Sequence, residues 1–335
     1  MTGRLIIEVR KPGMLTTVQD AGRQGYQKHG VIVSGAMDEF ALRVANLLVG
    51  NAEREAVLEM TMIGPALHFR EEALIAVCGG DLSPTREGVP VPQWQPVWVA
   101  AGSTLEWKQA KAGCRACLAI AGGLSVPQVM GSKSTFLRAK IGGFSGRALE
   151  SNDVLELGAR TARQEERIER LRVKANGSPM LAEPVSPAWE IFPNYDLTPE
   201  VRVLLGREFE RFDEASRRRF FQEAYAVTPQ SDRMGYRLQG GALQLAKPFE
   251  LISEAVSIGT IQVPQEGNPI LLLADRQTTG GYPRIAQVIT ADLPLLAQVK
   301  PGGSVRFRQV TIGEAHAALL ERERNLAKLR LALAL

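Results

Sequence analysis

Short apolar runs rich in Val, Ile and Leu, separated by turn-forming residues, constrain the fold of this chain more than any other feature. The 335 residues include 32 glycines and 19 prolines, which interrupt the runs at the spacing typical of strands and turns. The runs do not alternate regularly with long helical patterns, so a doubly wound parallel sheet is not expected. The sequence therefore predicts a mainly β protein.

The predicted strands are distributed over both halves of the chain. In the first half they lie at 73–78, 97–100, 104–107, 117–121 and 154–157. In the second half they lie at 201–205, 225–228, 258–263, 269–274, 285–289 and 304–308. A hairpin is also predicted, in which 237–238 pairs with 242–245 across a pair of glycines.

Helices are predicted to be few, and they are placed by their caps. Ser34 precedes an amphipathic pattern that runs from Met37 to Leu48. Asp213 opens a second pattern, and a third runs from Glu314 to about Leu333. The third is expected to pack on the body of the protein or on a partner.

The domain organisation is predicted from one charged stretch. Residues 160–174 are highly charged and are followed by Asn-Gly-Ser-Pro and several prolines, which is typical of an inter-domain connection. We therefore expect an N-terminal domain at 1–195, a C-terminal domain at 196–312 and a separate helix at 313–335. A chain of this length has room for two domains by the soft prior of about 150 residues each.

Composition excludes several classes of protein. Forty Lys and Arg against 36 Asp and Glu give a net charge of +4 spread over the chain, so a nucleic-acid partner is not implied. No apolar stretch approaches the roughly 18 residues of a spanning helix, and no leader pattern is present, so we expect a cytoplasmic protein without a membrane partner. Three cysteines do not indicate a disulfide framework.

Several familiar motifs are present in part and fail on inspection. The segment 131–135, Gly-Ser-Lys-Ser-Thr, lacks the glycines that a phosphate loop requires, although its backbone and Lys133 could still bind an anion. Cys114 and Cys117 resemble half of a zinc or redox motif, but their spacing on a strand sends them to opposite faces, so we interpret them as structural. No metal site is predicted.

The strongest chemical signal is a polar loop that follows an apolar strand. Residues 270–274 are apolar enough for a central strand, and they run directly into the polar, glycine-containing segment 275–284. Asp275 and Arg276 open this segment, and such groups suit a small substrate with carboxylate, amide or carbonyl groups. The alternative is an Arg-Asp pair that merely braces a turn, and we favour function.

Two further clusters combine Asp, Arg, Gly and Tyr. One spans 16–26 and contains Gln19, Asp20, Arg23 and Tyr26. The other spans 231–237 and contains Asp232 and Arg233. Either could equally be a turn held by an ion pair.

These polar segments, with 34–38, 131–135 and 261–264, resemble the KipA family. That family is also called allophanate hydrolase subunit 2, the biotin-dependent carboxyltransferase family, or the C-type component of the bacterial ATP-dependent 5-oxoprolinase. The resemblance extends from about residue 5 to 310. It implies two cyclophilin-like β-barrel domains, a KipI-like partner subunit and, in the oxoprolinase, a LamB/YcsF-like subunit.

The leading hypothesis is that the chain is a subunit of the oxoprolinase, which converts 5-oxo-L-proline to L-glutamate with ATP, bound here or by a partner. For that reaction we assign catalytic roles to Asp275, Arg276 and Asp232. Substrate-binding roles are assigned to Gln277, Thr278, Thr279, Tyr282, Arg284, Arg233, Gln262, Gln19, Asp20, Arg23, Tyr26 and Ser34.

Two alternatives remain open at this point. In a urea carboxylase the same loop would face the biotin ring during carboxyl transfer. In a regulator the chain would bind a KipI-type inhibitor of a histidine kinase. One departure from the family is Ala255, where glycine is frequent. We expect it to alter a turn without affecting the reactive groups.

Overall fold

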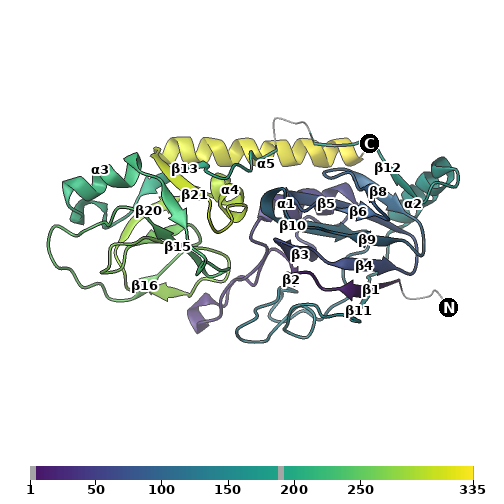
Figure 1. Cartoon of the computed structure of the whole chain (residues 1–335), viewed down its shortest axis with the longest axis horizontal. Coiled ribbons are helices and arrows are strands. Elements are labelled where there is room, and N and C mark those ends of the chain that lie inside the picture. Colours follow the sequence, from purple (N-terminus) through teal and green to yellow (C-terminus); the bar gives the residue numbers. More distant parts are fainter. Residues whose placement is uncertain (1–4, 188–191, 335) are drawn as a thin grey trace. The chain divides into compact units, whose positions relative to one another are not determined.

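The computed structural model describes residues 5–187 and 192–334, which form two compact units (Figure 1). Unit 1 comprises the described residues of 1–23, 38–192 and 326–335, and unit 2 comprises 24–37 and 193–325. The long middle segment of unit 1 ends at residue 192, close to the domain boundary predicted at 195. Residues 24–37, expected in the N-terminal domain, belong to unit 2, and residues 326–335, expected in a separate helix, belong to unit 1.

Unit 1 contains two six-stranded antiparallel sheets, where the sequence predicted a barrel. The first has the order β11-β1-β4-β9-β6-β7 and the second β12-β8-β5-β10-β3-β2. The strands are β1 Ile6–Lys11, β2 Leu15–Gln19, β3 Val57–Thr61, β4 Ala66–Phe69, β5 Ala73–Asp81, β6 Thr85–Arg86, β7 Val89–Pro90, β8 Pro96–Val99, β9 Thr104–Glu106, β10 Ala112–Ile120, β11 Val154–Glu156 and β12 Met180–Ala182.

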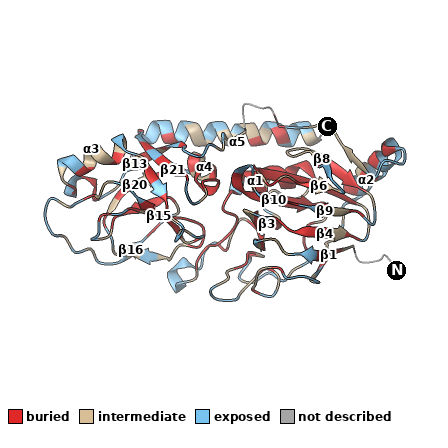
Figure 2. Ribbon diagram, in the orientation of Figure 1, coloured by how far each residue is buried: buried red, intermediate tan, exposed pale blue. Residues whose placement is uncertain are grey.

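Burial on both faces explains why the central strands of the second sheet are mostly apolar. Strand β5 is buried over its first eight residues, and β10 over its last eight. Helix α1 (Glu39–Leu48) packs on β5 and β10, while Val77 and Leu118 belong to the hydrophobic core of unit 1 (Figure 2). The three cysteines of the chain lie in these two strands as buried free thiols.

Unit 2 is built on a closed seven-stranded barrel of order β13-β20-β17-β18-β15-β14-β21. Neighbouring strands are antiparallel except β13 and β21, which are parallel. The strands are β13 Glu200–Leu205, β14 Tyr225–Val227, β15 Gly235–Gln239, β17 Thr260–Gln262, β18 Ile270–Leu272, β20 Arg284–Val288 and β21 Ser304–Gln309. A separate two-stranded sheet pairs β16 Glu254–Ala255 with β19 Thr279–Gly280, which is part of the polar loop.

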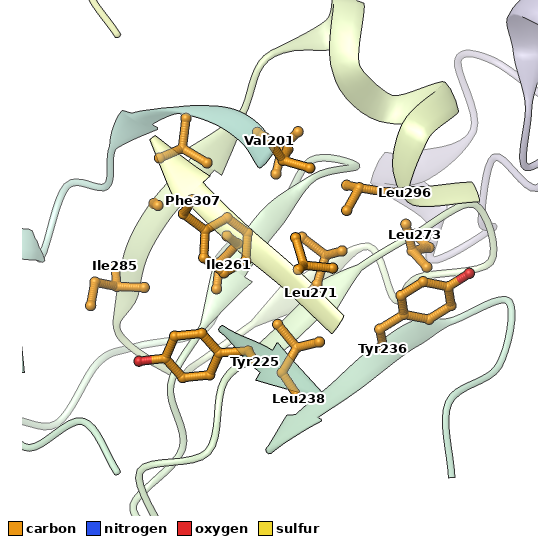
Figure 3. Packing of buried hydrophobic residues seen from close by; sticks show 14 of the residues in the cluster. Val201, Tyr225, Tyr236, Leu238, Ile261, Leu271, Leu273, Ile285, Leu296 and Phe307 are labelled. Atoms are coloured by element: carbon orange, nitrogen blue, oxygen red, sulfur yellow. The ribbon is translucent and has the colours of Figure 1, made fainter. Parts of the chain in front are cut away.

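The barrel is filled by alternate side chains of its strands (Figure 3). Val201, Ile261 and Leu271 are fully buried there, as period-two alternation predicts. Phe307 of β21 stacks on Phe220 with ring centroids 4.7 Å apart. The mainly β class is thereby confirmed.

Short helices complete unit 2. They are η1 Gln27–His29, η3 Phe209–Arg211, α3 Glu214–Gln222, η4 Thr290–Asp292 and α4 Leu293–Ala297. Asp213 caps α3 as predicted, because its side chain accepts a hydrogen bond from the Ser216 amide. The long helix α5 (Ile312–Ala334) matches the predicted third helix.

Three local predictions were wrong. The charged segment 160–174 is not a linker but helix α2 (Ala162–Ala175), which begins with a capping box between Thr161 and Gln164. The predicted cap Ser34 does not start α1, because Asp38 fills that position and accepts from the Ala41 amide at 2.9 Å. The predicted 237–245 hairpin is absent from the described structure, since β15 pairs with β14 and β18 instead.

Candidate active site

The polar loop 275–284 leaves the barrel directly after β18, as predicted. The chain turns at Ala274 and Asp275, and the Arg276 amide donates to the Leu273 carbonyl at 3.2 Å. The segment that precedes β15 supports this turn, because the Leu273 and Asp275 amides donate to the carbonyls of Met234 and Arg233. The loop therefore starts from a rigid part of the barrel.

Asp275, Arg233 and Ser34 form a buried ionic cluster in unit 2. The Arg233 Nε and Nη2 atoms donate to the two Asp275 oxygens at 3.0 and 3.2 Å. The Ser34 hydroxyl donates to Asp275 Oδ1 at 2.8 Å, and Arg233 Nη2 also donates to the Gly35 carbonyl. Each of the three side chains belongs to a residue that is at most 6% exposed. Three separately predicted residues thus meet in one place.

Ser34 adopts an unusual backbone conformation for a residue with a side chain. Its φ is 58°, and that of Gly35 is 94°, so both lie in the left-handed region. This conformation costs a non-glycine residue about 1 kcal/mol or more, and such strain is frequent at functional sites. The turn directs the serine hydroxyl to Asp275 and the glycine carbonyl to Arg233.

Arg276 differs from the other arginines of the loop region because no carboxylate in the described chain neutralises it. Its side chain donates to the Leu273 carbonyl at 3.4 Å, and its Nε atom is buried without an acceptor. Burial lowers the pKa of the Arg276 guanidinium below its usual value. A partly buried cation without a counter-ion is costly, and a bound anion would remove that cost.

Arg284, in contrast, is fully engaged by two carboxylates. Its Nε and Nη2 atoms donate to the Glu208 oxygens at 2.8 Å, and Nη2 also donates to Glu254 at 2.9 Å. Burial would raise the pKa of Glu208, but the hydrogen bonds from the Arg284 side chain and amide outweigh burial and lower it. The pKa of Arg284 is raised by the same contacts. Its charge is compensated within the protein.

The remaining predicted loop residues surround the second half of the segment. Gln277 and Thr278 are half-buried, and Thr279 lies in β19 opposite Ala255. The buried Gln262 side chain donates to the Tyr282 carbonyl at 3.4 Å. A Cβ atom at Gly280 would come within 2.5 Å of the Gln262 side-chain amide nitrogen, so a larger residue there would displace that side chain.

A cavity of about 620 Å³ lies beside the end of this loop. Tyr282 lines it and is 48% exposed. The cavity wall includes several apolar and aromatic side chains, among them Phe212, Leu243, Phe249 and Val263. Its size is in the range of small-molecule pockets.

Two predicted residues of unit 2 lie at the surface. Asp232 is exposed, and its carboxylate accepts from the Met234 amide at 2.8 Å, which is the geometry of an Asx turn. Tyr26 is 38% exposed and precedes the short helix η1.

The predicted cluster Gln19, Asp20 and Arg23 belongs to unit 1 and braces a loop. Asp20 Oδ1 accepts from the hydroxyls of Ser132 and Ser134 at 2.7 and 2.5 Å, and Oδ2 accepts from the Lys133 amide at 2.6 Å. Gln19 donates to the Thr135 carbonyl, and Arg23 donates to the carbonyls of Val129 and Ser134. All these contacts hold one segment, 129–135.

The same contacts explain why 131–135 does not offer a free anion site. The Lys133 amide already binds the Asp20 carboxylate, and Lys133 Nζ donates to Glu55 at 2.6 Å. A carboxylate of the chain itself therefore occupies the place that a phosphate would need.

Sequence reasoning missed the partners that decide these roles. Glu208 and Glu254 lie 76 and 30 residues from Arg284, and the Gly35 carbonyl lies 198 residues from Arg233. A carboxylate or carbonyl at such a separation leaves no local pattern. The apolar run before Asp275 was a sufficient signal for the loop itself.

Two features are absent from the described residues. No group of three or more His, Cys, Asp or Glu side chains there could hold a metal ion. No helix in the same part of the chain is both long and apolar enough to cross a membrane.

The architecture of this chain, mainly β with a closed barrel, is shared with proteins of known structure. The family model described as carboxyltransferase domain, subdomain A and B, matches residues 29–309. The chain belongs to this carboxyltransferase family.

Two curated bacterial proteins, both named as the C-type component of 5-oxoprolinase, are similar over nearly their whole length. The protein of Escherichia coli (strain K12) is 37% identical over 324 residues, 97% of each chain. The protein of Haemophilus influenzae is 38% identical over 299 residues, 89% of each chain.

A solved structure is also similar to this chain. The urea carboxylase of Kluyveromyces lactis superimposes with a TM-score of 0.87 at 30% identity, and the match covers 98% of this chain. The chain spans 30% of the length of that protein.

Proposed function

We propose that this chain is a subunit of an ATP-dependent 5-oxoprolinase, in which 5-oxo-L-proline is opened to L-glutamate. The two bacterial relatives that are named as a 5-oxoprolinase component support this, because the similarity covers 89–97% of both chains. Their name indicates a multi-subunit enzyme. We propose a KipI-like and a LamB/YcsF-like subunit as the partners, with activity in the complex.

The observation that carries the proposal is Arg276. The substrate is a small lactam with one carboxylate, and Arg276 is a half-buried cation without a carboxylate partner in the described residues. A guanidinium binds a carboxylate with two parallel hydrogen bonds, and its partial burial strengthens the contact. Gln277, Thr278 and Tyr282 follow on the same loop, and we propose that they orient the lactam amide.

The segment 131–135, which resembles part of a phosphate loop, does not fit a nucleoside triphosphate. Asp20 and Glu55 already engage the Lys133 amide and ammonium groups. We therefore propose that ATP is bound by a partner subunit. The role of this chain is then to bind the lactam, to fix its carboxylate and to present its carbonyl group.

The test is glutamate release from 5-oxo-L-proline and ATP by this chain with both partner subunits. Arg276→Ala should lower kcat/KM by about a hundredfold, because a charge-assisted bidentate contact contributes roughly 2–3 kcal/mol. Arg276→Lys should recover part of the loss. The control is Arg218→Ala, which removes an exposed ion pair on α3 and should leave the rate unchanged.

The outcomes separate the candidate functions. Full activity of Arg276→Ala would remove the loop from the mechanism. No glutamate from a well-folded wild-type mixture would remove the oxoprolinase. In that case the second candidate is carboxyl transfer from biotin, which the likeness to urea carboxylase supports. Urea carboxylation with a biotinylated carrier should then be measured. A complex with the KipI-like subunit that shows neither activity would favour the regulator.

A further inference from the structure

Two arginines lie close to Asp275 along the chain or in space. Arg233 lies in the turn just before β15, while Arg276 follows Asp275 directly in the sequence. Arg233 donates to both carboxylate oxygens, and Arg276 donates to a backbone carbonyl instead. The Asp275 carboxylate therefore pairs with Arg233, and Arg276 has no carboxylate partner among the described residues.

Ser34 also contacts the Asp275 carboxylate that Arg233 binds. Its hydroxyl donates to Asp275 Oδ1, so that Asp275 accepts three side-chain hydrogen bonds from two residues. Arg233 is held in turn by the Gly35 carbonyl. With three donors on its two oxygens, the carboxylate has few acceptor sites left for direct contact with a substrate.

The backbone fixes the same group from the other side. The Asp275 amide donates to the Arg233 carbonyl at 2.8 Å, and the turn that ends at Arg276 closes on the Leu273 carbonyl. The side chain and the main chain of Asp275 are therefore both held. The point at which the Arg276 side chain leaves the backbone is fixed as a result.

We propose that Asp275 is a positioning residue, held by Ser34 and Arg233, whose task is to orient Arg276 while leaving its charge free for the carboxylate of the substrate. This rests on the proposed function for the identity of the substrate. It replaces the proton-transfer role that the sequence suggested for Asp275. It also gives Ser34 and Arg233 supporting roles rather than direct contacts with the substrate.

Asp275→Asn in the reconstituted complex separates the two roles of this residue. Asparagine keeps the shape and can still accept from Ser34, so a positioning role predicts a KM for 5-oxo-L-proline raised about tenfold and a kcat within about threefold. A general acid or base would instead lose about a hundredfold or more in kcat, with a changed pH profile. Asp196→Asn, an exposed aspartate that caps its own turn, is the matched control.

A second measurement does not depend on activity. Phenylglyoxal modifies accessible guanidinium groups, and peptide mass spectrometry reports the modification rate of Arg276 in the isolated chain. In Arg233→Met, Asp275 is released to pair with Arg276, so the rate at Arg276 should fall severalfold. Ser34→Ala, which removes one hydrogen bond and no charge, should produce a smaller decrease. Circular dichroism establishes that each variant is folded.

The possible outcomes are distinct. A large loss of kcat in Asp275→Asn, or an unchanged Arg276 modification rate in folded Arg233→Met and Ser34→Ala, would overturn the positioning role. A wild-type complex without glutamate release would overturn the proposed function, and the modification rates would still decide the role of Asp275.

Discussion

At the scale of single residues, two buried aspartates show how the same side chain acquires different roles. Asp20 accepts from the Lys133 amide and from two serine hydroxyls, and it thereby holds a loop of unit 1. Asp275 accepts from Arg233 and Ser34 in unit 2, next to Arg276, which has no carboxylate partner among the described residues. The sequence presented both as Asp in a polar cluster with Arg. The donors around each one make the difference.

The bracing role of Asp20 leads to a stability prediction. Asp20→Ala leaves buried amide and hydroxyl donors without an acceptor, and it should lower the free energy of unfolding by about 3 kcal/mol. Urea denaturation with a tryptophan fluorescence readout would measure this. Glu106→Gln, an exposed change in β9, should have an effect of less than about 0.5 kcal/mol. An equally small effect of Asp20→Ala would show that the loop does not need the carboxylate.

At the scale of elements, polar contacts between neighbouring segments fix the ends of the strands that carry the site. Glu208 precedes η3 and accepts from both the side chain and the amide of Arg284, the first residue of β20. This pair ties the far end of the polar loop to the barrel. Arg284 was predicted as a substrate ligand, and in the structure its charge is balanced by the carboxylates of Glu208 and Glu254.

The Glu208 pair should make stability depend on pH in the acid range. The folded state lowers the pKa of Glu208 below its usual 4.5, so the pair stabilises the protein above that value and the contribution is lost as pH falls through the folded pKa. At pH 7, Glu208→Gln should cost about 2 kcal/mol. The difference from wild type should shrink below about pH 4, as measured by urea unfolding across pH. A difference that stays constant down to about pH 3 would contradict this.

At the scale of the whole molecule, each unit has its own hydrophobic core. Phe220, Ile261 and Phe307 belong to the core of unit 2, whereas Val77 and Leu118 belong to that of unit 1. A change in one core therefore acts first on the strands that share it.

Phe220→Ala tests this separation. Removing a fully buried ring that stacks on Phe307 should destabilise unit 2 by about 3–5 kcal/mol. Hydrogen exchange should become faster in β14 and β21 and stay nearly unchanged in β5 and β10. Equal acceleration in all four strands would show that the chain unfolds as one cooperative body. Leu320→Ala, an exposed change on α5, is the control.

Much of the fold and part of the site could be predicted from local patterns. Alternation and apolar runs indicated the positions of the strands, because burial of one or both faces acts on neighbouring residues. Asp213 indicated the start of α3, because a capping side chain bonds to an amide only three residues further along the chain. The charged helix α2 was missed because its buried face consists of only Gln164, Ile168, Leu171 and Ala175, which a charged sequence conceals.

The sequence by itself determined that this is a mainly β chain with a polar loop after a buried strand, since these properties depend on residues next to one another. The tertiary structure decided which charges remain free. The sequence does not distinguish the three arginines of this region. In the structure Asp275 pairs with Arg233 and Glu208 pairs with Arg284, whereas Arg276 has no carboxylate partner among the described residues. Their pairing depends on contacts between segments up to 241 residues apart, and such contacts exist only once the barrel has closed.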